Sequence, residues 1–246
     1  MTKNLYIIDI EITAKKFRHS MPLLHAIHPF PNATFAVWQI EEEEMFFQEN
    51  LVLSAVEIRE LEALKGRRRQ EWLAVRWLLH DISGHALRLP LAKDAFSKPF
   101  FTDQPGLACS LSHSQKLVGA LLVEQGGGAV GCDLQVLVEK MPRLAPKFLN
   151  FRETEFIRDQ PRREQFVLQH LFWTAKESLY KAYGIKELDF RAHLEVAPFV
   201  WNGTEAMTTG QIRKNTYDQS FRLWMKSEER PAGSEYVWTV CAPLES

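Results

Sequence analysis

The sequence has 246 residues, of which 46% are hydrophobic and 25% charged, a composition typical of a globular protein and not of a disordered or fibrous one. Thirty Lys and Arg side chains balance 31 Asp and Glu side chains, so no overall positive field favours nucleic acid or an anionic membrane. Three cysteines without a Cys-x-x-Cys pair argue against a disulfide framework and a zinc site, and indicate a reducing, cytoplasmic location. The longest later apolar run, residues 117–123, is too short to cross a bilayer.

The beginning of the chain predicts two strands. Residues 5–12 and 34–40 are short apolar and β-branched runs bounded by Asn, Pro and charged residues. Asp9 and Glu11 interrupt the first run, which is therefore neither a signal peptide nor a membrane span. Four consecutive glutamates at residues 41–44 predict a solvated turn after the second strand.

A helical region follows. Ser54 and Glu57 have the spacing of a capping box, and Gly66 interrupts the helix that they begin. A second helix is expected over residues 67–82 and should end at Gly84. Its core-facing side chains are those that recur at helical spacing, namely Trp72, Val75, Leu79 and Ile82.

The middle of the chain predicts a hairpin and a boundary. Residues 108–112 and 117–124 are two strands joined by a tight turn, and residues 130–135 are a further strand. Three glycines at residues 126–128 form a flexible joint between them. We therefore expect an N-terminal unit at residues 1–127 and a C-terminal unit at residues 128–246.

The second unit has a similar make-up. Asn150 and Glu153 form another capping box, and Pro161 suits the first turn of a longer helix that ends at Gly184. Strands return at the end of the chain, most clearly at residues 236–241. The predicted fold class is α+β, with two α+β units in tandem.

An arginine cluster is the first candidate functional feature. Residues 67–69 are all Arg, and Arg76 follows on the same predicted helix. Such a cluster is either a solvated helix face or a phosphate clamp, because guanidinium groups match phosphate oxygens. A nucleic-acid site that also uses Trp72 and Trp77 is disfavoured by the net charge of -1.

A second feature combines Lys98-Pro99 with Ser112-His113-Ser114 at a strand end. His113 between two serines either caps the local backbone or donates to a phosphate oxygen, with Ser112 as a further donor. A Ser–His nucleophile pair is disfavoured, because adjacent strand residues point to opposite faces.

The third feature is a carboxylate inside an apolar strand. Asp133 would be costly there unless it is paired or bound to a metal. Gln135, two residues on, faces the same way, so both side chains could reach one cation.

The fourth feature lies within the long helix. Glu177 and Lys181 have the i, i+4 spacing of a surface ion pair. Alternatively, Glu177 is an oxygen ligand for Mg²⁺ and Lys181 a cation beside a developing phosphate charge.

In chain order, these features resemble the 4'-phosphopantetheinyl transferases of the Sfp-like, surfactin-activating type. The motifs that carry the resemblance are the Arg-rich helix, Lys98-Pro99, Ser112-His113-Ser114, Gly131-Cys132-Asp133, and Trp173-Thr174-Ala175-Lys176-Glu177-Ser178 with Lys181. The resemblance implies a monomer of two halves related by a pseudo-two-fold axis, with coenzyme A in the cleft between them. It implies a holo-[acyl-carrier-protein] synthase activity that moves phosphopantetheine to a serine of an apo acyl or peptidyl carrier protein, releases adenosine 3',5'-bisphosphate and requires Mg²⁺.

The resemblance also assigns roles to residues. Coenzyme A would contact Arg68 or Arg69 with Arg76, Lys98, Pro99, Ser112, His113, Lys176 and Lys181. The metal ligands would be Asp133, Gln135 and Glu177, and the catalytic groups Glu177, Lys181 and Glu155, the last as a candidate base.

Gln135 departs from the pattern, because many relatives have an acid there. An amide oxygen can ligate Mg²⁺ or Mn²⁺ without adding charge, so we expect one more water on the metal. The departure also leaves open a catalytically silent module that only binds coenzyme A or a carrier protein. Carrier docking by basic residues is expected near the start of the second unit, at Lys140, Arg143 and Lys147.

Overall fold

The computed structural model describes residues 23–124, 128–231 and 233–244. The strand predicted at residues 5–12 and the first two glycines of the predicted joint lie outside these ranges. No helix in the described ranges is both long enough and apolar enough to span a membrane.

A four-stranded antiparallel sheet in the order β1-β2-β6-β5 forms the first part of the fold. Gln115 and Lys116 both have positive φ angles, which suits the tight hairpin turn that joins β5 to β6. The predicted hairpin and the strand predicted at residues 34–40 are therefore confirmed, whereas β1 was not predicted. The strands are β1 Leu23–Ile27, β2 Ala33–Gln39, β5 Ala108–Ser114 and β6 Leu117–Val123.

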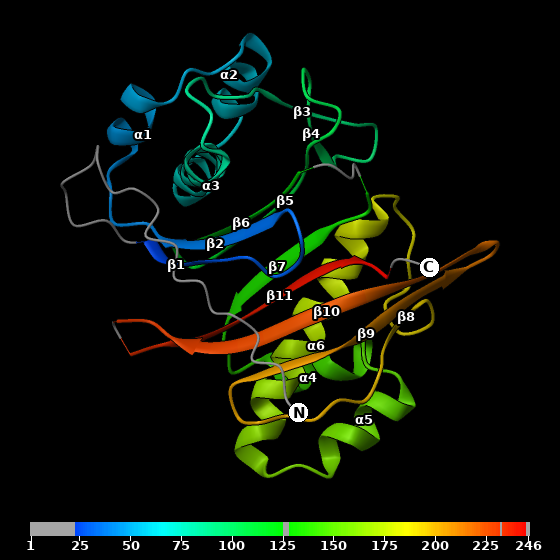
Figure 1. The fold of residues 1–246 in the computed structure, drawn as a ribbon. Helices are drawn as coiled ribbons and strands as arrows, with labels where there is room; N and C mark the ends of the chain where they lie inside the picture. Colours follow the sequence, from blue (N-terminus) through cyan, green and yellow to red (C-terminus); the bar gives the residue numbers. More distant parts are fainter. Residues whose placement is uncertain (1–22, 125–127, 232, 245–246) are drawn as a thin grey trace, which may run out of the picture.

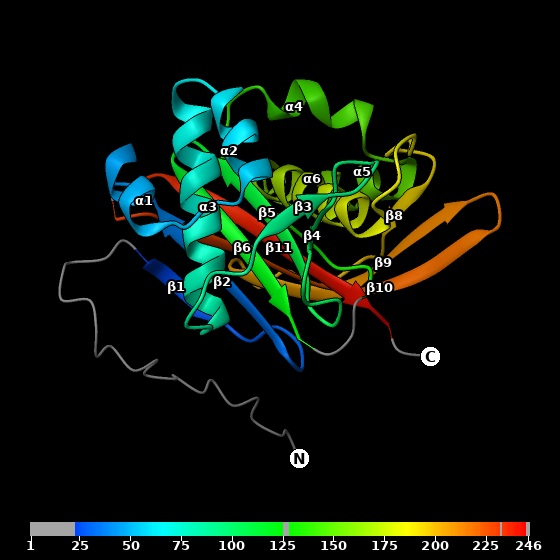
Figure 2. The same cartoon turned by 90° about the horizontal axis from the view of Figure 1, so that it is seen from above.

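Three helices cover one face of this sheet (Figure 1), and the longest, α3, crosses it diagonally (Figure 2). The predicted capping box is present, with mutual hydrogen bonds between Ser54 and Glu57. Gly84 ends α3 in the left-handed conformation, as predicted. The glutamate run is only partly a turn, because Glu44 already begins α1. The elements are α1 Glu44–Asn50, α2 Ala55–Glu62 and α3 Arg67–Ser83, followed by a small hairpin of β3 Leu91–Lys93 and β4 Pro99–Phe101.

A five-stranded antiparallel sheet in the order β7-β11-β10-β9-β8 forms the second part. Asn150 and Glu153 make the second predicted capping box, and Gly184 ends α6. Pro161 immediately precedes the first helical residue of α6. The strands are β7 Gly131–Val136, β8 Leu194–Val196, β9 Glu205–Lys214, β10 Tyr217–Glu229 and β11 Glu235–Pro243; the helices are α4 Met141–Leu144, the 3-10 turn Ala145–Lys147, α5 Phe151–Arg158 and α6 Arg162–Tyr183.

The helices lie on the outside and the two sheets between them (Figure 1), so the fold contains both helix–sheet and sheet–sheet cores. Strand alternation assigns each side chain to one core. In β2, Phe35 and Val37 pack between the sheets, whereas Ala36 and Trp38 face α3. The predicted mixed helix-and-strand class is therefore confirmed.

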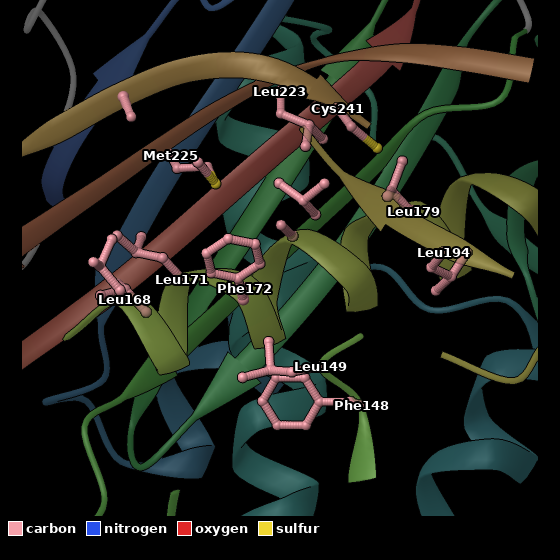
Figure 3. Packing of buried hydrophobic residues seen from close by; sticks show 14 of the residues in the cluster. Phe148, Leu149, Leu168, Leu171, Phe172, Leu179, Leu194, Leu223, Met225 and Cys241 are labelled. Carbon is pink, nitrogen blue, oxygen red and sulfur yellow. The ribbon is translucent and has the colours of Figure 1, made fainter. Parts of the chain in front are cut away.

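The core beneath α6 holds the second sheet in place. Figure 3 shows Leu171 and Phe172 of α6 facing Leu223 and Met225 of β10, and all four are buried. A nonpolar face of this length fixes α6 against the sheet by removing apolar surface from water. The strand β7 therefore has a fixed position relative to α6.

The edge strands of the two sheets, β5 and β7, meet through side chains. The N–H groups of Cys132, Leu134 and Val136 donate to the hydroxyl oxygens of Ser110, Ser112 and Ser114, at 2.9, 3.1 and 3.2 Å respectively. We call these three serines the serine ladder. It satisfies the N–H groups that β7 turns away from its own sheet.

Candidate active site

An ion pair joins β7 to α6. Strand alternation turns Asp133 toward α6, where Lys181 Nζ lies 2.8 Å from Asp133 Oδ1. The same ammonium donates to the carbonyl oxygens of Leu111 at 3.1 Å and Cys132 at 2.9 Å. Burial alone would lower the pKa of Lys181, but the adjacent Asp133 carboxylate holds it above its ordinary value. Lys181 is therefore a permanent cation at this point.

Glu177 lies one helical turn before Lys181. Burial, and after it the nearby Asp133 carboxylate, raises the pKa of Glu177 to about 7, while Lys181 opposes the rise. Two carboxylates are thus close enough to repel each other. The predicted surface ion pair of Glu177 with Lys181 is replaced by the pair of Lys181 with Asp133.

Gln135 follows Asp133 on the same face of β7. Its Nε2 donates to the carbonyl oxygen of Val136 at 2.8 Å and to Ser114 Oγ at 3.3 Å. A carbonyl can only accept, so the amide nitrogen is the atom at that position. The amide oxygen remains for another partner.

The oxygen donors of Asp133, Gln135 and Glu177 suit a hard divalent cation. Within the described residues, no group of three or more His, Cys, Asp or Glu side chains could hold a metal by itself. Mg²⁺ is commonly held by one or two carboxylates, with waters and substrate phosphates as the other ligands. The repulsion between Asp133 and Glu177 is a further reason for a cation to bind here.

A cavity of about 580 Å³ lies beside this acidic group, between α3, the β3–β4 hairpin, β5 and the end of α6. A volume of this size is typical of small-molecule sites. Its described lining contains six Lys and Arg side chains and no Asp or Glu, which makes it an anion site. The six cations are Arg68, Arg76, Lys93, Lys98, Lys181 and Lys186.

Lys98 reaches the cavity from the β3–β4 hairpin. Asp94 Oδ1 accepts the Lys98 backbone N–H at 2.9 Å, which fixes the turn. The ammonium donates to the carbonyl oxygen of Ala182 at 3.0 Å, at the C-terminal end of α6, where a cation is favourable. Pro99 lines the cavity as well. Gly184 is required here, because it has φ +71° and a side chain would overlap that of Lys98.

The arginines of α3 have different environments. The guanidinium of Arg76 is buried 3.3 Å above the Trp72 ring and 3.4 Å from both Glu57 and Glu60. Burial lowers the pKa of Arg76 to about 10, although both acids raise it. Arg76 therefore remains charged, but Glu57 and Glu60 compensate its positive charge in the cavity wall.

Arg69 bonds Glu44 at 2.5 Å and the carbonyl oxygen of Leu61 at 2.6 Å, and it lines neither large cavity near the site. Arg68 lines both. Of the two alternatives for a coenzyme A contact, Arg68 is therefore the one whose position favours it.

His113 separates the first cavity from a second cavity of about 740 Å³ and lines both. Its Nδ1 lies 3.2 Å from Glu71 Oε2. Burial lowers the pKa of His113 although Glu71 raises it, so the neutral ring predominates at pH 7. The second cavity also contains Gln135 and Trp173.

Two predicted residues lie away from this group. Lys176 is fully buried, and its ammonium contacts Glu153 Oε2 at 2.7 Å and the carbonyl oxygens of Phe148, Phe190 and Leu194. It has no route to a ligand in either cavity, so its predicted contact with coenzyme A is not supported by position.

Glu155 lies on α5, where its carboxylate pairs with Arg158 at 2.5 Å. Among the described residues, no hydrogen bond or ion pair joins this carboxylate to Asp133, Glu177 or Lys181, so its predicted role as base is not supported by position. Sequence reasoning missed Lys93, Tyr180 and Lys186, which line the first cavity. Lys186 follows the glycine that ends α6, and this proximity to the helix end was the available signal.

Ser112 lies beside the proposed metal ligand Asp133 and does not line the first cavity. Its hydroxyl donates to Asp133 Oδ1 at 2.7 Å. An anion cavity beside clustered oxygen donors is the arrangement expected of an enzyme that acts on a phosphate ester.

Comparison with known proteins agrees with this class. Residues 129–241 match the family model of the 4'-phosphopantetheinyl transferase superfamily. The chain is also 32% identical over 126 residues to 4'-phosphopantetheinyl transferase HetI of Nostoc sp. (strain PCC 7120). That match covers 47% of this chain and 52% of the relative, so the chain spans about half the length of the curated relative it matches. The resemblance predicted from the motifs is confirmed, because both comparisons find similarity to 4'-phosphopantetheinyl transferases.

Proposed function

We propose that this protein transfers the 4'-phosphopantetheine group of coenzyme A to a serine of an apo acyl or peptidyl carrier protein and releases adenosine 3',5'-bisphosphate. The observation that carries the proposal is the cavity lined by six cationic side chains and no described acid. Coenzyme A presents a diphosphate and a 3'-phosphate, which such a lining can bind. The family match of residues 129–241 supports the same reaction.

The coenzyme A phosphates are assigned to Arg68, Lys98 and Lys186, with His113 as a neutral donor. Arg76 and Lys93 contribute less, because Glu57 and Glu60 already face Arg76, and Glu60 also pairs with Lys93 at 2.9 Å. Apolar and aromatic lining residues provide a surface for the adenine ring, among them Trp72, Phe96, Tyr180 and Ile185.

Asp133, Glu177 and the Gln135 amide oxygen would hold Mg²⁺, or Mn²⁺ as the alternative. When bound, the ion supplies positive charge that masks the diphosphate oxygens. Ser112 and Lys181 hold one oxygen of Asp133 in place. Lys181 also places its own positive charge beside the transferred phosphate.

In the transfer, the serine Oγ of the carrier bonds to the phosphorus of the phosphopantetheine phosphate. The bond from that phosphorus to the bridging diphosphate oxygen breaks, and adenosine 3',5'-bisphosphate leaves with the bonding electrons. Glu177 accepts the serine proton, directly or through water, because its carboxyl group lies beside Asp133 and Lys181 at the proposed metal site. We assign no step to Glu155.

We further propose the Sfp-like type with holo-[acyl-carrier-protein] synthase activity, as a cytoplasmic monomer. The proposed halves, residues 1–127 and 128–246, each contain an antiparallel sheet crossed by one long helix, α3 or α6. This correspondence supports a pseudo-two-fold relationship between them.

Carrier docking is proposed at the second cavity. Lys140 lines it together with Met141, Leu144 and Trp173, which combines basic and apolar surface. Arg143 and Lys147 follow on the adjoining short helices. An acidic amphipathic helix would complement such a surface.

Intact-mass spectrometry of an apo carrier protein incubated with this protein, coenzyme A and Mg²⁺ tests the function. We expect a phosphopantetheine mass increase that disappears with EDTA and in Asp133→Ala. If several types of carrier protein show no mass increase while coenzyme A still binds, the protein is a catalytically silent binding module and not a transferase.

A further inference from the structure

The three members of the serine ladder share one role and differ in another. Each hydroxyl oxygen accepts one N–H of β7, from Cys132, Leu134 or Val136. Only Ser112 also donates to a carboxylate, at 2.7 Å from Asp133 Oδ1. Of the three serines, Ser112 is therefore the one that both joins β5 to β7 and contacts a proposed metal ligand.

The Ser112 hydroxyl has no capacity for a further donor bond. It carries one proton, which the contact with Asp133 uses, and the residue is only 5% exposed. Lys181 Nζ bonds the same oxygen, Oδ1, at 2.8 Å. The hydrogen bonds that described residues make to this carboxylate both fall on Oδ1, which leaves Oδ2 as the oxygen that could bind a cation.

We propose that Ser112 is a positioning residue that holds Asp133 in the orientation required to bind a divalent cation, and is not a contact for coenzyme A. This inference rests on the proposed metal role of Asp133. Groups that hydrogen-bond a metal-ligating carboxylate fix its orientation, and their loss typically lowers metal affinity by about 10- to 100-fold. Ser112 meets that description from a strand of the opposite sheet.

Ser110 provides a matched control. Ser110→Ala and Ser112→Ala each remove one hydroxyl that accepts a buried β7 N–H, from Cys132 or Leu134. Ser110 and Ser112 are 3% and 5% exposed, so the two changes disturb similarly buried positions. Only Ser112→Ala removes a contact with Asp133.

The experiment measures Mn²⁺ binding to the purified full chain by electron paramagnetic resonance, with and without saturating coenzyme A. Thermal unfolding is recorded for each variant. We expect Ser112→Ala to raise the Mn²⁺ Kd about tenfold or more. Ser110→Ala should lower Tm by a similar amount and leave unchanged the Mn²⁺ Kd measured without coenzyme A, which is the series used for this comparison because Ser110 lines the first cavity.

Equal Mn²⁺ affinity in Ser112→Ala and the unchanged protein would overturn the positioning role, provided that Asp133→Ala abolishes binding. An equal loss in Ser110→Ala and Ser112→Ala would also overturn it, because the ladder would then act only through strand packing. If the unchanged protein binds no Mn²⁺, or Asp133→Ala binds it normally, the proposed metal site itself fails, and the inference with it.

Discussion

Gly131 lies so close to the carbonyl oxygen of Ser178 that a β-carbon on residue 131 would overlap it. Glycine at this point lets β7 approach α6 at backbone distance. The approach brings Asp133 within 2.8 Å of Lys181, the contact on which the proposed site depends. The clash is with backbone, which cannot move as a flexible side chain would.

Gly131→Ala should therefore lower the free energy of unfolding by about 1 to 3 kcal/mol, the typical range for an overpacked core. Urea denaturation followed by circular dichroism measures the change. Gly106→Ala is the control, because nothing described lies within 4 Å of a β-carbon there. Equal stability of the two variants would contradict the close approach of β7 to α6.

Glu177→Gln should stabilise the protein at pH 8 while abolishing transfer. The carboxyl group has a pKa of about 7 in the folded protein against its ordinary value of 4.5, because burial and Asp133 disfavour its charge. Between these values the unfolded chain binds fewer protons, so stability falls as pH rises. Glutamine does not ionise, so the variant does not lose stability in this way. Its free energy of unfolding should exceed that of the unchanged protein by on the order of 2 kcal/mol at pH 8, and by less near pH 5.

Urea unfolding at pH 5 and pH 8 measures the difference for Glu177→Gln. Glu155→Gln is the comparison, because Glu155 lies on another helix in a partly exposed pair with Arg158. That variant should show no pH-dependent gain and should retain transfer. A Glu177→Gln protein without any gain at pH 8 would show that the carboxyl group ionises normally.

Lys176→Met should destabilise the protein without weakening coenzyme A binding by the folded molecules. Its ammonium is fully buried against Glu153, so its removal leaves an unpaired buried carboxylate at a cost of about 3 to 5 kcal/mol. Chemical denaturation measures the loss, and Glu153→Gln combined with Lys176→Met should recover part of it. Lys98→Met, by contrast, should weaken binding in a coenzyme A titration. Weaker binding in Lys176→Met than in Lys98→Met would restore the role predicted from the sequence.

The three cysteines should not react in the native protein. All are free and buried. Burial raises the pKa of Cys109 to about 12 and of Cys132 to about 11, and raises that of Cys241 as well. At pH 8, a thiol-reactive chromogen should label none of them natively and all three in urea. Rapid native labelling of Cys109, which lines the first cavity, would show that this cavity opens.

Features set by neighbours in the sequence were predicted well. The two capping boxes at Ser54 and Asn150 depend on residues three apart, and both are present. The turn at Gln115 and Lys116 is likewise local. Asp133 was identified because a carboxylate in an apolar strand requires a partner, and the structure supplies Lys181 and Ser112.

Features set by distant residues were not predicted. The helix α1 begins within the glutamate run because Phe47 is buried against the first sheet and α3, and Glu44 pairs with Arg69. The charge pattern alone predicted only a solvent-exposed turn. Lys176 and Glu177 are adjacent in one motif, yet helical geometry directs Lys176 to Glu153, 23 positions away, and Glu177 toward Asp133.

The serine ladder also has a consequence for the edge of the second sheet. An edge strand with unpaired N–H groups is a template for strands of other molecules. Here Ser110, Ser112 and Ser114 occupy the outward N–H groups of β7, and they come from the edge of the other sheet. One row of short hydroxyl side chains thus occupies the outward N–H groups of β7 and joins this edge to the other sheet, so neither group of atoms is left for a strand of another molecule.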